Sequence, residues 1–212
     1  MNWLADLADL AVGTRCAACE APALGLCGAC LSAIRPQPLI VRERPCPVAA
    51  AGEYDGTLRS ALLAWKERGR FTVERPLALL LAASVVTLDV EPPISLVPVP
   101  SRPDRRRARG SDVVQDLARA SAKVLRKVGV DVRVTSSLRL VRRVRDQAGL
   151  SAAARADNLR GAFILRPPAQ PARSIVLVDD IVTTGATLHA AVGACRARGV
   201  NVGGAAVVAH RT

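Results

Sequence analysis

Aromatic residues are scarce in this chain. Phe, Trp and Tyr make up only 2% of its 212 residues, although half of all residues are hydrophobic. Ala, Val and Leu must therefore fill the core of what is, by length, one α/β domain with a small appendage. Few rings remain for stacking on bases, which argues against the usual aromatic platform for single-stranded nucleic acid.

Long hydrophobic runs are also missing. The longest apolar stretch covers residues 77–88, well below the roughly 20 residues that a membrane-spanning helix needs. Residues 1–13 fit a short amphipathic helix, but they contain Asp6 and Asp9 and lack the basic region of a signal peptide. We therefore expect a cytoplasmic protein with no membrane span.

Negative charge is in short supply. Asp and Glu total 18 against 30 Lys and Arg, which gives a net charge of +12. Lysine is rare, and its positions are Lys66, Lys123 and Lys127. Genome composition could explain the preference for Arg over Lys, but not the excess of positive charge. This balance favours anionic partners, namely phosphorylated metabolites, nucleic acid or both.

Four of the six cysteines form two CxxC pairs. Each pair brings two thiolates to one side of a metal, so the pattern suits a closed, structural zinc site. Two disulfides or free thiols are the alternatives, and a reducing cytoplasm disfavours disulfides. Cys46 could be an alternative ligand, whereas Cys195 lies on an apolar helix face and is expected in the core. The expected zinc ligands are Cys16, Cys19, Cys27 and Cys30.

Strand and helix patterns alternate after the cysteine segment. The alternation predicts an α/β fold, in which a parallel sheet carries helices on both faces. We expect two parts: residues 1–45, with the N-terminal helix and the zinc-binding segment of four cysteines, and residues 46–212, which form the core. The expected strands are 46–54, 94–99, 131–135, 175–178 and 202–209, and the expected helices are 57–68, 74–88, 111–129 and 187–198.

The most informative stretch is residues 174–188, SIVLVDDIVTTGATL. A buried strand at 175–178 is followed by Asp179 and Asp180, and then by a hydroxyl-rich turn that begins a helix. Parallel strands open into a ligand crevice at their carboxyl ends, and helix N-termini bind phosphate. The acids could hold sugar hydroxyls or a divalent cation, which together with the turn indicates a sugar phosphate. An ordinary P-loop is not expected, because the turn has no lysine; a plain buried strand with a polar turn is the alternative. The expected phosphate contacts are Thr183, Thr184, Gly185, Ala186 and Thr187.

Two basic segments accompany this motif. Residues 97–110 form a loop after an expected strand, and Arg side chains there could bind phosphate oxygens bidentately. Residues 142–163 read as a basic flexible loop that could close over a site. Solvated basic loops are the alternative interpretation of both. The residues singled out are Pro100, Ser101, Arg102, Arg105 and Arg109 in the first segment, and Arg143, Arg145, Gln147, Arg155 and Asn158 in the second.

The 174–188 motif resembles the 5-phosphoribosyl-1-pyrophosphate (PRPP) signature of type I phosphoribosyltransferases. Nearly the whole chain resembles the ComF family, phosphoribosyltransferase-like proteins linked to DNA uptake in competent bacteria. Ser111-Asp112 departs from the Phe-Asn that the family usually has there, and Val144 stands where it often has Thr. The features shared with the family are the two CxxC pairs, Tyr54-Asp55-Gly56 with Leu58, Arg59 and Lys66, the VPVP loop with its Arg-x-Arg-Gly, Gln147 to Asn158, Gly161-Ala162-Phe163, and the PRPP signature.

The resemblance implies a type I phosphoribosyltransferase fold and a function. Asp179 and Asp180 would be catalytic, the 183–187 turn would bind the 5-phosphate, and the 100–109 loop would bind pyrophosphate. The protein would bind PRPP with magnesium and transfer ribose 5-phosphate to an acceptor that the sequence does not identify. The alternative is a non-catalytic accessory of DNA uptake or recombination that binds single-stranded DNA or a DNA-processing protein. Assembly as a homo-oligomer is left open.

Overall fold

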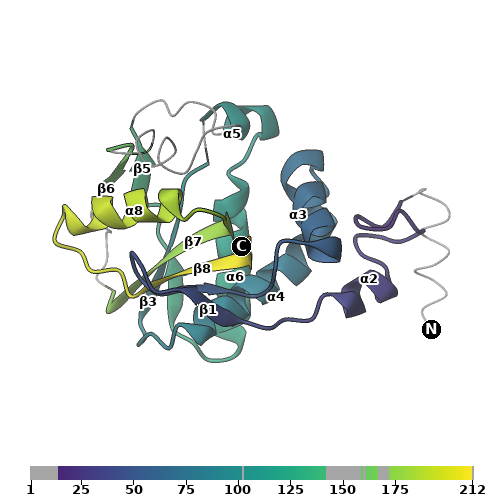
Figure 1. Cartoon of the computed structure of the whole chain (residues 1–212), viewed down its shortest axis with the longest axis horizontal. Helices are drawn as coiled ribbons and strands as arrows, with labels where there is room; N and C mark the ends of the chain where they lie inside the picture. Colours follow the sequence, from purple (N-terminus) through teal and green to yellow (C-terminus); the bar gives the residue numbers. More distant parts are fainter. Residues whose placement is uncertain (1–13, 102, 142–158, 160, 167–171, 212) are drawn as a thin grey trace.

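A six-stranded, mostly parallel sheet forms the centre of the molecule (Figure 1). The structure is a computed structural model that describes residues 14–101, 103–141, 159, 161–166 and 172–211. The strand order is β1-β2-β8-β7-β3-β4, and only the β1–β2 pair within this sheet is antiparallel. The strands are β1 (Leu39–Arg42), β2 (Val48–Ala50), β3 (Ile94–Pro98), β4 (Val132–Val134), β7 (Ser174–Val182) and β8 (Gly204–His210).

The helices and a small second sheet surround these strands. Strands β5 (Leu138–Leu140) and β6 (Phe163–Leu165) form an antiparallel pair of their own. The helices are α2 (Gly28–Ala33), α3 (Gly56–Arg68), the 3₁₀ turn η1 (Phe71–Val73), α4 (Glu74–Thr87), α5 (Pro103–Arg109), α6 (Val113–Lys127) and α8 (Ala186–Arg196).

Helices cover both faces of the sheet, each with its own apolar cluster. On one face α4 and α6 pack together, because the apolar side of α6, with Leu117 and Leu125, faces the nearly all-apolar α4. On the other face α8 buries Leu188 and Val192 against Leu177 of β7. The predicted α/β fold with a mostly parallel sheet is therefore confirmed, and the architecture is consistent with the type I phosphoribosyltransferase fold.

Some local predictions were wrong, each for a visible reason. The expected loop at 97–110 contains α5, a short helix that begins at Pro103, a residue suited to the first position of a helix. The helix expected at 111–129 begins two residues later, at Val113, because Asp112 has an extended backbone and caps α6. Strand β7 continues to Val182 instead of ending at residue 178, because β8 keeps pairing with it as far as His210.

The structure also contains strands that the sequence did not predict. Strand β1 lies within residues 14–45 and extends the core sheet by pairing with β2. The division of the chain at residue 45 stays a prediction. The expected helix at 1–13 lies outside the described residues.

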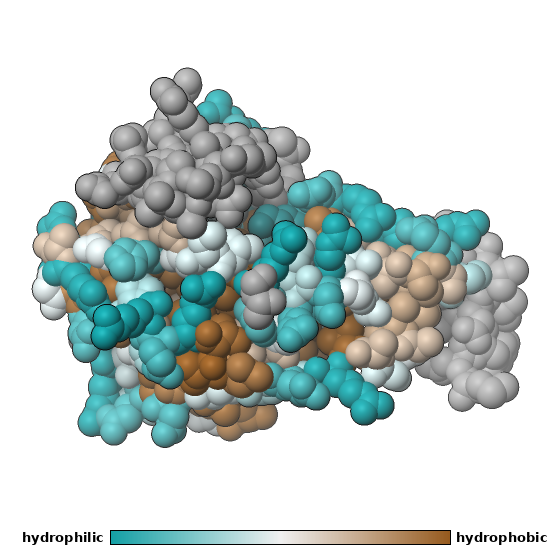
Figure 2. All heavy atoms as spheres, viewed as in Figure 1, coloured by the Kyte–Doolittle hydropathy of each residue, from teal (hydrophilic) through white to brown (hydrophobic). Residues whose placement is uncertain are grey.

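Polar and apolar residues are unevenly distributed on the face seen in Figure 2. Hydrophilic residues are spread over the described part of this face, and hydrophobic residues gather near its lower centre. Within the described part of the chain, no helix combines the length and apolar character needed to cross a membrane.

Candidate functional site

Two neighbouring parallel strands, β3 and β7, bring the candidate site together. Pro98 lies opposite Val178, and the backbone N–H of Val99 donates to the carbonyl of Val178 at 2.8 Å. The residues that follow Pro98 and Val178 therefore emerge at the same sheet edge. This is the edge where α/β folds bind ligands, and it carries the predicted acids and the Pro100–Ser101 loop.

Asp180 is buried at this edge and forms an ion pair with Lys66 of α3. The carboxylate side chain is only 5% exposed, whereas the Lys66 side chain is 26% exposed. Burial opposes ionisation of Asp180, but the Lys66 ammonium and hydrogen bonds outweigh it and lower the pKa of Asp180. Asp180 therefore remains a carboxylate at neutral pH.

The pKa of Asp179 is shifted in the opposite direction. Its Oδ1 accepts a hydrogen bond from the backbone N–H of Asp180 at 2.9 Å. Burial, and then repulsion from the Asp180 carboxylate, raise the pKa of Asp179 well above its ordinary value. The pKa values of these two adjacent acids are therefore shifted in opposite directions, an arrangement that is common at functional sites.

The hydroxyl-rich turn connects β7 to the first turn of α8. Gly185 caps the helix with a φ of 77°, a left-handed conformation that favours glycine. Thr183 and Thr184 are exposed, and Thr184 Oγ1 accepts a weak hydrogen bond from the Ala186 N–H at 3.4 Å. Free N–H groups at a helix start and nearby hydroxyls can bind an anion.

Arg42, on the edge strand β1, also reaches this turn. Its guanidinium donates a hydrogen bond to the carbonyl oxygen of Thr183. A Cβ placed on Gly185 would lie 3.8–3.9 Å from atoms of the Arg42 side chain. A cationic group is therefore held beside a turn whose own sequence contains no cation.

The loop after β3 already has an acidic partner within the protein. Asp112, at the start of α6, accepts hydrogen bonds from the Ser101 backbone N–H at 3.1 Å and from the Ser101 hydroxyl at 2.9 Å. Two donors predicted to bind pyrophosphate are thus bound to a carboxylate. Pro100 is half-buried beside them.

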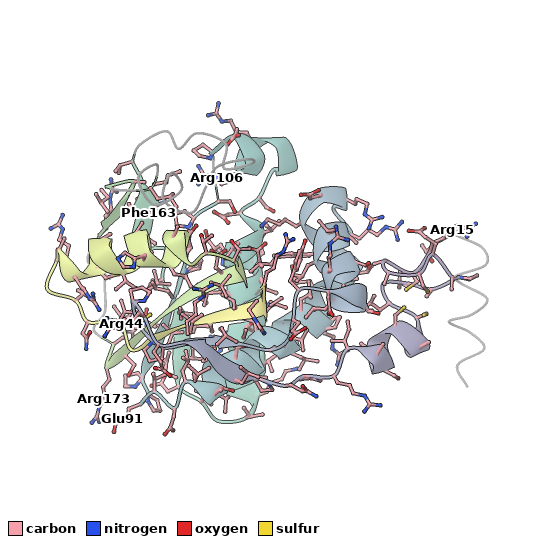
Figure 3. The ribbon with its side chains drawn as sticks, in the orientation of Figure 1. Arg15, Arg44, Glu91, Arg106, Phe163 and Arg173 are labelled. Carbon is pink, nitrogen blue, oxygen red and sulfur yellow. The ribbon has the colours of Figure 1, made fainter. Side chains whose placement is uncertain are left out.

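Four arginines of this loop, at positions 105, 106, 107 and 109, fall on α5. Arg106 and Arg107 are exposed, and Figure 3 shows Arg106 on α5, well separated from Arg44. Arg102 lies outside the described residues, as do the side chains of Arg105 and Arg109. The predicted flexible-loop residues Arg143, Arg145, Gln147, Arg155 and Asn158 also lie outside them.

A hollow of about 580 Å³ opens between α5 and α6. Arginines and carboxylates both line it, and Asp179 and Asp180 do not contribute to it. Its position beside Ser101 extends the polar edge toward α6. The lining residues are Arg106, Arg107, Gly110, Ser111, Asp112, Gln115, Asp116 and Arg119.

The four predicted cysteine ligands form a second candidate site, at the end of the molecule that carries α2 (Figure 1). Their sulfur atoms all lie within 4.8 Å of one another. Cys16 and Cys30 are buried, whereas Cys19 is exposed. Neither Cys46 nor Cys195 belongs to this group, because both are buried in the cluster beneath α8, which is the core position expected of Cys195.

The chemistry of this cluster fits zinc. Four thiols match the ligands of a closed structural site. Burial opposes ionisation of Cys16, but backbone N–H groups, including that of Cys27 at 3.3 Å, donate to its sulfur and lower its pKa to about 6. A sulfur already stabilised as a thiolate is suited to metal binding. The four cysteines could therefore hold a structural zinc ion.

Contacts also join the cysteine segment to the core. Arg70, just after α3, donates to the carbonyl oxygens of Arg15 at 2.9 Å and Cys16 at 3.2 Å. Its guanidinium lies 3.8 Å from Glu20, and Ala17 is buried in the same apolar cluster as Trp65 of α3. The helix that carries Lys66 therefore contacts both candidate sites.

Sequence reasoning assigned no role to three residues that the fold brings to the sheet edge: Lys66, Arg42 and Asp112. Lys66 is one of only three lysines, and this rarity was a usable signal. Arg42 is one arginine among many, and Asp112 was noted only as a departure from a family pattern. Their partners lie far away along the chain or across a loop, so local pattern could not reveal the contacts.

A comparison with known proteins finds a relative of this chain. No family model matches the chain. Competence protein F of Haemophilus influenzae is 31% identical over 145 residues, which cover 65% of this chain and 61% of that protein. The matched region thus spans less than two thirds of the relative. The chain is therefore similar to Competence protein F over this region, in agreement with the ComF resemblance of its motifs.

Proposed function

We propose that the protein binds PRPP with magnesium at the carboxyl end of β7 and transfers its ribose 5-phosphate to an acceptor. The observation that carries this proposal is the order and geometry of two acids near the carboxyl end of β7, one of them held ionised by Lys66, followed by the turn that leads into α8. Acids suit ribose hydroxyls, and the turn suits a phosphate. The Pro100–Ser101 loop on the adjacent strand is the proposed pyrophosphate position.

In the proposed reaction, a nucleophilic acceptor forms a bond to C1 of the ribose as the bond from C1 to pyrophosphate breaks. Pyrophosphate leaves with the bonding electrons, so positive charge develops on the sugar. Asp180, kept ionised by Lys66, would stabilise that charge. Asp179, whose pKa is raised, would hold a ribose hydroxyl by hydrogen bonding.

Magnesium fits the same residues. It prefers oxygen ligands and usually binds through one or two carboxylates together with substrate phosphates. The half-buried Asp179 offers carboxylate oxygens near the carboxyl end of β7. When bound with PRPP, magnesium would neutralise charge on the leaving pyrophosphate.

Calorimetric titration with PRPP and magnesium tests this proposal. We expect saturable binding and, at about 100 times the dissociation constant, roughly 2.7 kcal/mol of added stability. Asp179→Asn with Asp180→Asn should abolish binding, whereas Asp89→Asn, a change in the turn after α4, should not. Undiminished binding by the double variant would contradict the role of the two acids. If PRPP binds as expected, an assay of pyrophosphate release with a panel of amines and bases would identify the acceptor.

A second function is favoured by the relative's name and by the charge of the chain. Competence protein F is named for competence, and this chain carries a net charge of +12 with exposed arginines on α5. We propose, as the alternative, a competence-related accessory that binds single-stranded DNA along this face without turnover. The Ser101 N–H and hydroxyl both donate to Asp112, so neither is free to bind pyrophosphate. This is compatible with a site that does not release pyrophosphate.

Fluorescence titration with single-stranded DNA at several salt concentrations tests the alternative. Affinity should fall with salt at a log–log slope of roughly −0.7 for each neutralised phosphate. Arg106→Ser with Arg107→Ser should flatten the slope by about two contacts, whereas Arg35→Ser with Arg44→Ser, away from α5, should leave it unchanged. Absence of DNA binding at roughly 50 mM salt would eliminate this function.

A further inference from the structure

The turn between β7 and α8 lacks a cation of its own, yet the fold supplies one. Residues 183–187 contain no Lys or Arg. The nearby Lys66 is engaged by the Asp180 carboxylate. Arg42 of β1 instead places its guanidinium on the turn through a hydrogen bond to the Thr183 carbonyl oxygen.

The Arg42 guanidinium is anchored but not neutralised by the described part of the protein. No carboxylate among the described residues forms an ion pair with it. A guanidinium has five N–H donors, and the Thr183 carbonyl oxygen accepts a hydrogen bond without cancelling the charge. Arg42 is only half-buried, so its remaining donors are open to an incoming anion.

The position of the side chain matches the anion-binding end of α8. Arg42 atoms pack over Gly185, the N-cap residue, at 3.8–3.9 Å from where a Cβ would stand. The free N–H groups of the first helical turn begin just beyond this residue. A phosphate seated on those N–H groups would therefore lie next to the guanidinium.

We propose that Arg42 is a phosphate-binding residue that completes the 5-phosphate site of the 183–187 turn. This inference rests on the proposed PRPP function. Arg42 supplies the positive charge that other phosphate loops obtain from a lysine within the loop, and its hydrogen bond to Thr183 fixes the position of the guanidinium. The site thus combines helix N–H groups from α8 with a cation from an edge strand at the other end of the chain.

Isothermal titration with ribose 5-phosphate, PRPP and pyrophosphate, each with magnesium, tests the role of Arg42 separately from the proposed PRPP function. Arg42→Gln should lower the affinity for ribose 5-phosphate and for PRPP by roughly 10- to 100-fold, as expected for the loss of a charge-assisted hydrogen bond. Pyrophosphate binding should change by less than about twofold, because it does not occupy the turn. Arg42→Lys should recover part of the loss.

Arg44→Gln is the matched control. Arg44 lies two residues further along the same hairpin, is exposed, and forms no side-chain hydrogen bond or ion pair with any described residue. Its variant should bind all three ligands like the wild type. Unliganded melting temperatures show whether Arg42→Gln is folded, and a variant that does not fold is replaced in the comparison by Arg42→Lys.

A phosphorus NMR titration adds a measurement that a purely structural role would not affect. The second pKa of a phosphate monoester lies near 6, and a bound cation lowers it. That pKa should be lower for ribose 5-phosphate bound to the wild type than for the same ligand bound to Arg42→Gln. An equal phosphate pKa, or equal affinities of wild type and Arg42→Gln for PRPP, would overturn the role of Arg42 alone. Failure of the wild type to bind PRPP would instead overturn the proposed function, and the role of Arg42 with it.

Discussion

The cysteine cluster and the carboxyl edge of β7 are assembled in different ways. All four cysteines lie within residues 16–30, and their sulfurs meet within 4.8 Å. At the β7 edge, Asp180 meets Lys66 of α3, and the turn at Thr183 meets Arg42 of β1. The first site is local in sequence, whereas the second joins residues more than a hundred positions apart.

This difference affects what each site can do. A local set of four thiols closes around a metal and leaves no open position, so its contribution is to stability. The β7 edge keeps exposed hydroxyls, a half-buried acid and a half-buried arginine, so it can exchange ligands with solvent. The helix α3 contacts both sites, because it carries Lys66 and is followed by Arg70, which binds the Cys16 carbonyl oxygen.

Metal removal should produce the largest effect, and that effect should be confined to the cysteine cluster. We expect one zinc per chain by elemental analysis, since structural zinc binding in small sites is worth about 10–16 kcal/mol. Cys16→Ser should lose the metal and expose residues 14–33 to rapid amide hydrogen exchange. Amides of β7 and β8 should remain protected.

Cys46→Ala is the control for this experiment, because Cys46 is buried in the cluster beneath α8. It should retain the zinc. Two outcomes would contradict the distinction between a local and a dispersed site. One is an unchanged zinc content in Cys16→Ser, and the other is a loss of amide protection throughout β7 and β8.

Lys66→Met should produce the next largest effect. It leaves the Asp180 carboxylate buried without its ammonium partner, and breaking such a pair costs about 3 kcal/mol. The loss should appear in urea unfolding at pH 7. Adding Asp180→Asn should restore most of it, because the uncompensated charge is then gone. An equal loss in the single and double variants would show that Lys66 acts through other contacts.

Asp112→Asn tests the β3 side of the edge. The amide oxygen of Asn can accept one of the two Ser101 hydrogen bonds, and its NH2 group can donate to the Ser101 hydroxyl oxygen in place of the other. Asn is also a favoured N-cap residue for α6, but it removes a negative charge from the proposed pyrophosphate position. Affinity for pyrophosphate should rise about fivefold, from roughly 1 kcal/mol of relieved repulsion.

The neighbouring acid on α6 provides the comparison for that change. Asp116 is paired with Arg119 at 3.1 Å, so Asp116→Asn should raise the affinity much less. Equal affinity of the wild type and Asp112→Asn would indicate that pyrophosphate does not approach Ser101.

Asp179→Asn should give the smallest effect, which depends on pH. The pKa of Asp179 is raised above the ordinary 3.8, so the folded protein holds this proton more tightly than the unfolded chain. The associated stability is present below pH 3.8 and is lost as the pH rises through the folded-state pKa. At pH 7 the Asn variant should therefore be slightly more stable than the wild type, by less than the loss in Lys66→Met.

Unfolding at pH 4 and pH 7 checks the sign. The advantage of Asp179→Asn should shrink at the lower pH, where the wild-type carboxyl is protonated. A constant difference between the two pH values would mean that Asp179 does not titrate differently on folding.

The sequence by itself determined the features that depend on local spacing. The apolar run at 175–178, the alternation of elements and the two CxxC pairs predicted the parallel sheet and the cysteine cluster, because pairing and metal geometry are encoded within short windows. The local helix pattern at 57–68 likewise located α3. It did not reveal that Lys66 would face Asp180.

Only the tertiary structure decided which side chains meet at the sheet edge. The ion pair of Lys66 with Asp180 and the contact of Arg42 with the turn need strand order and helix packing, since neither pair is close in sequence. The Ser101–Asp112 contact spans only eleven residues, yet it depends on α5 turning the chain back on itself. The reason is the same in each case: the protonation and charge of a site are set by neighbours in space, and the packing of the sheet chooses those neighbours.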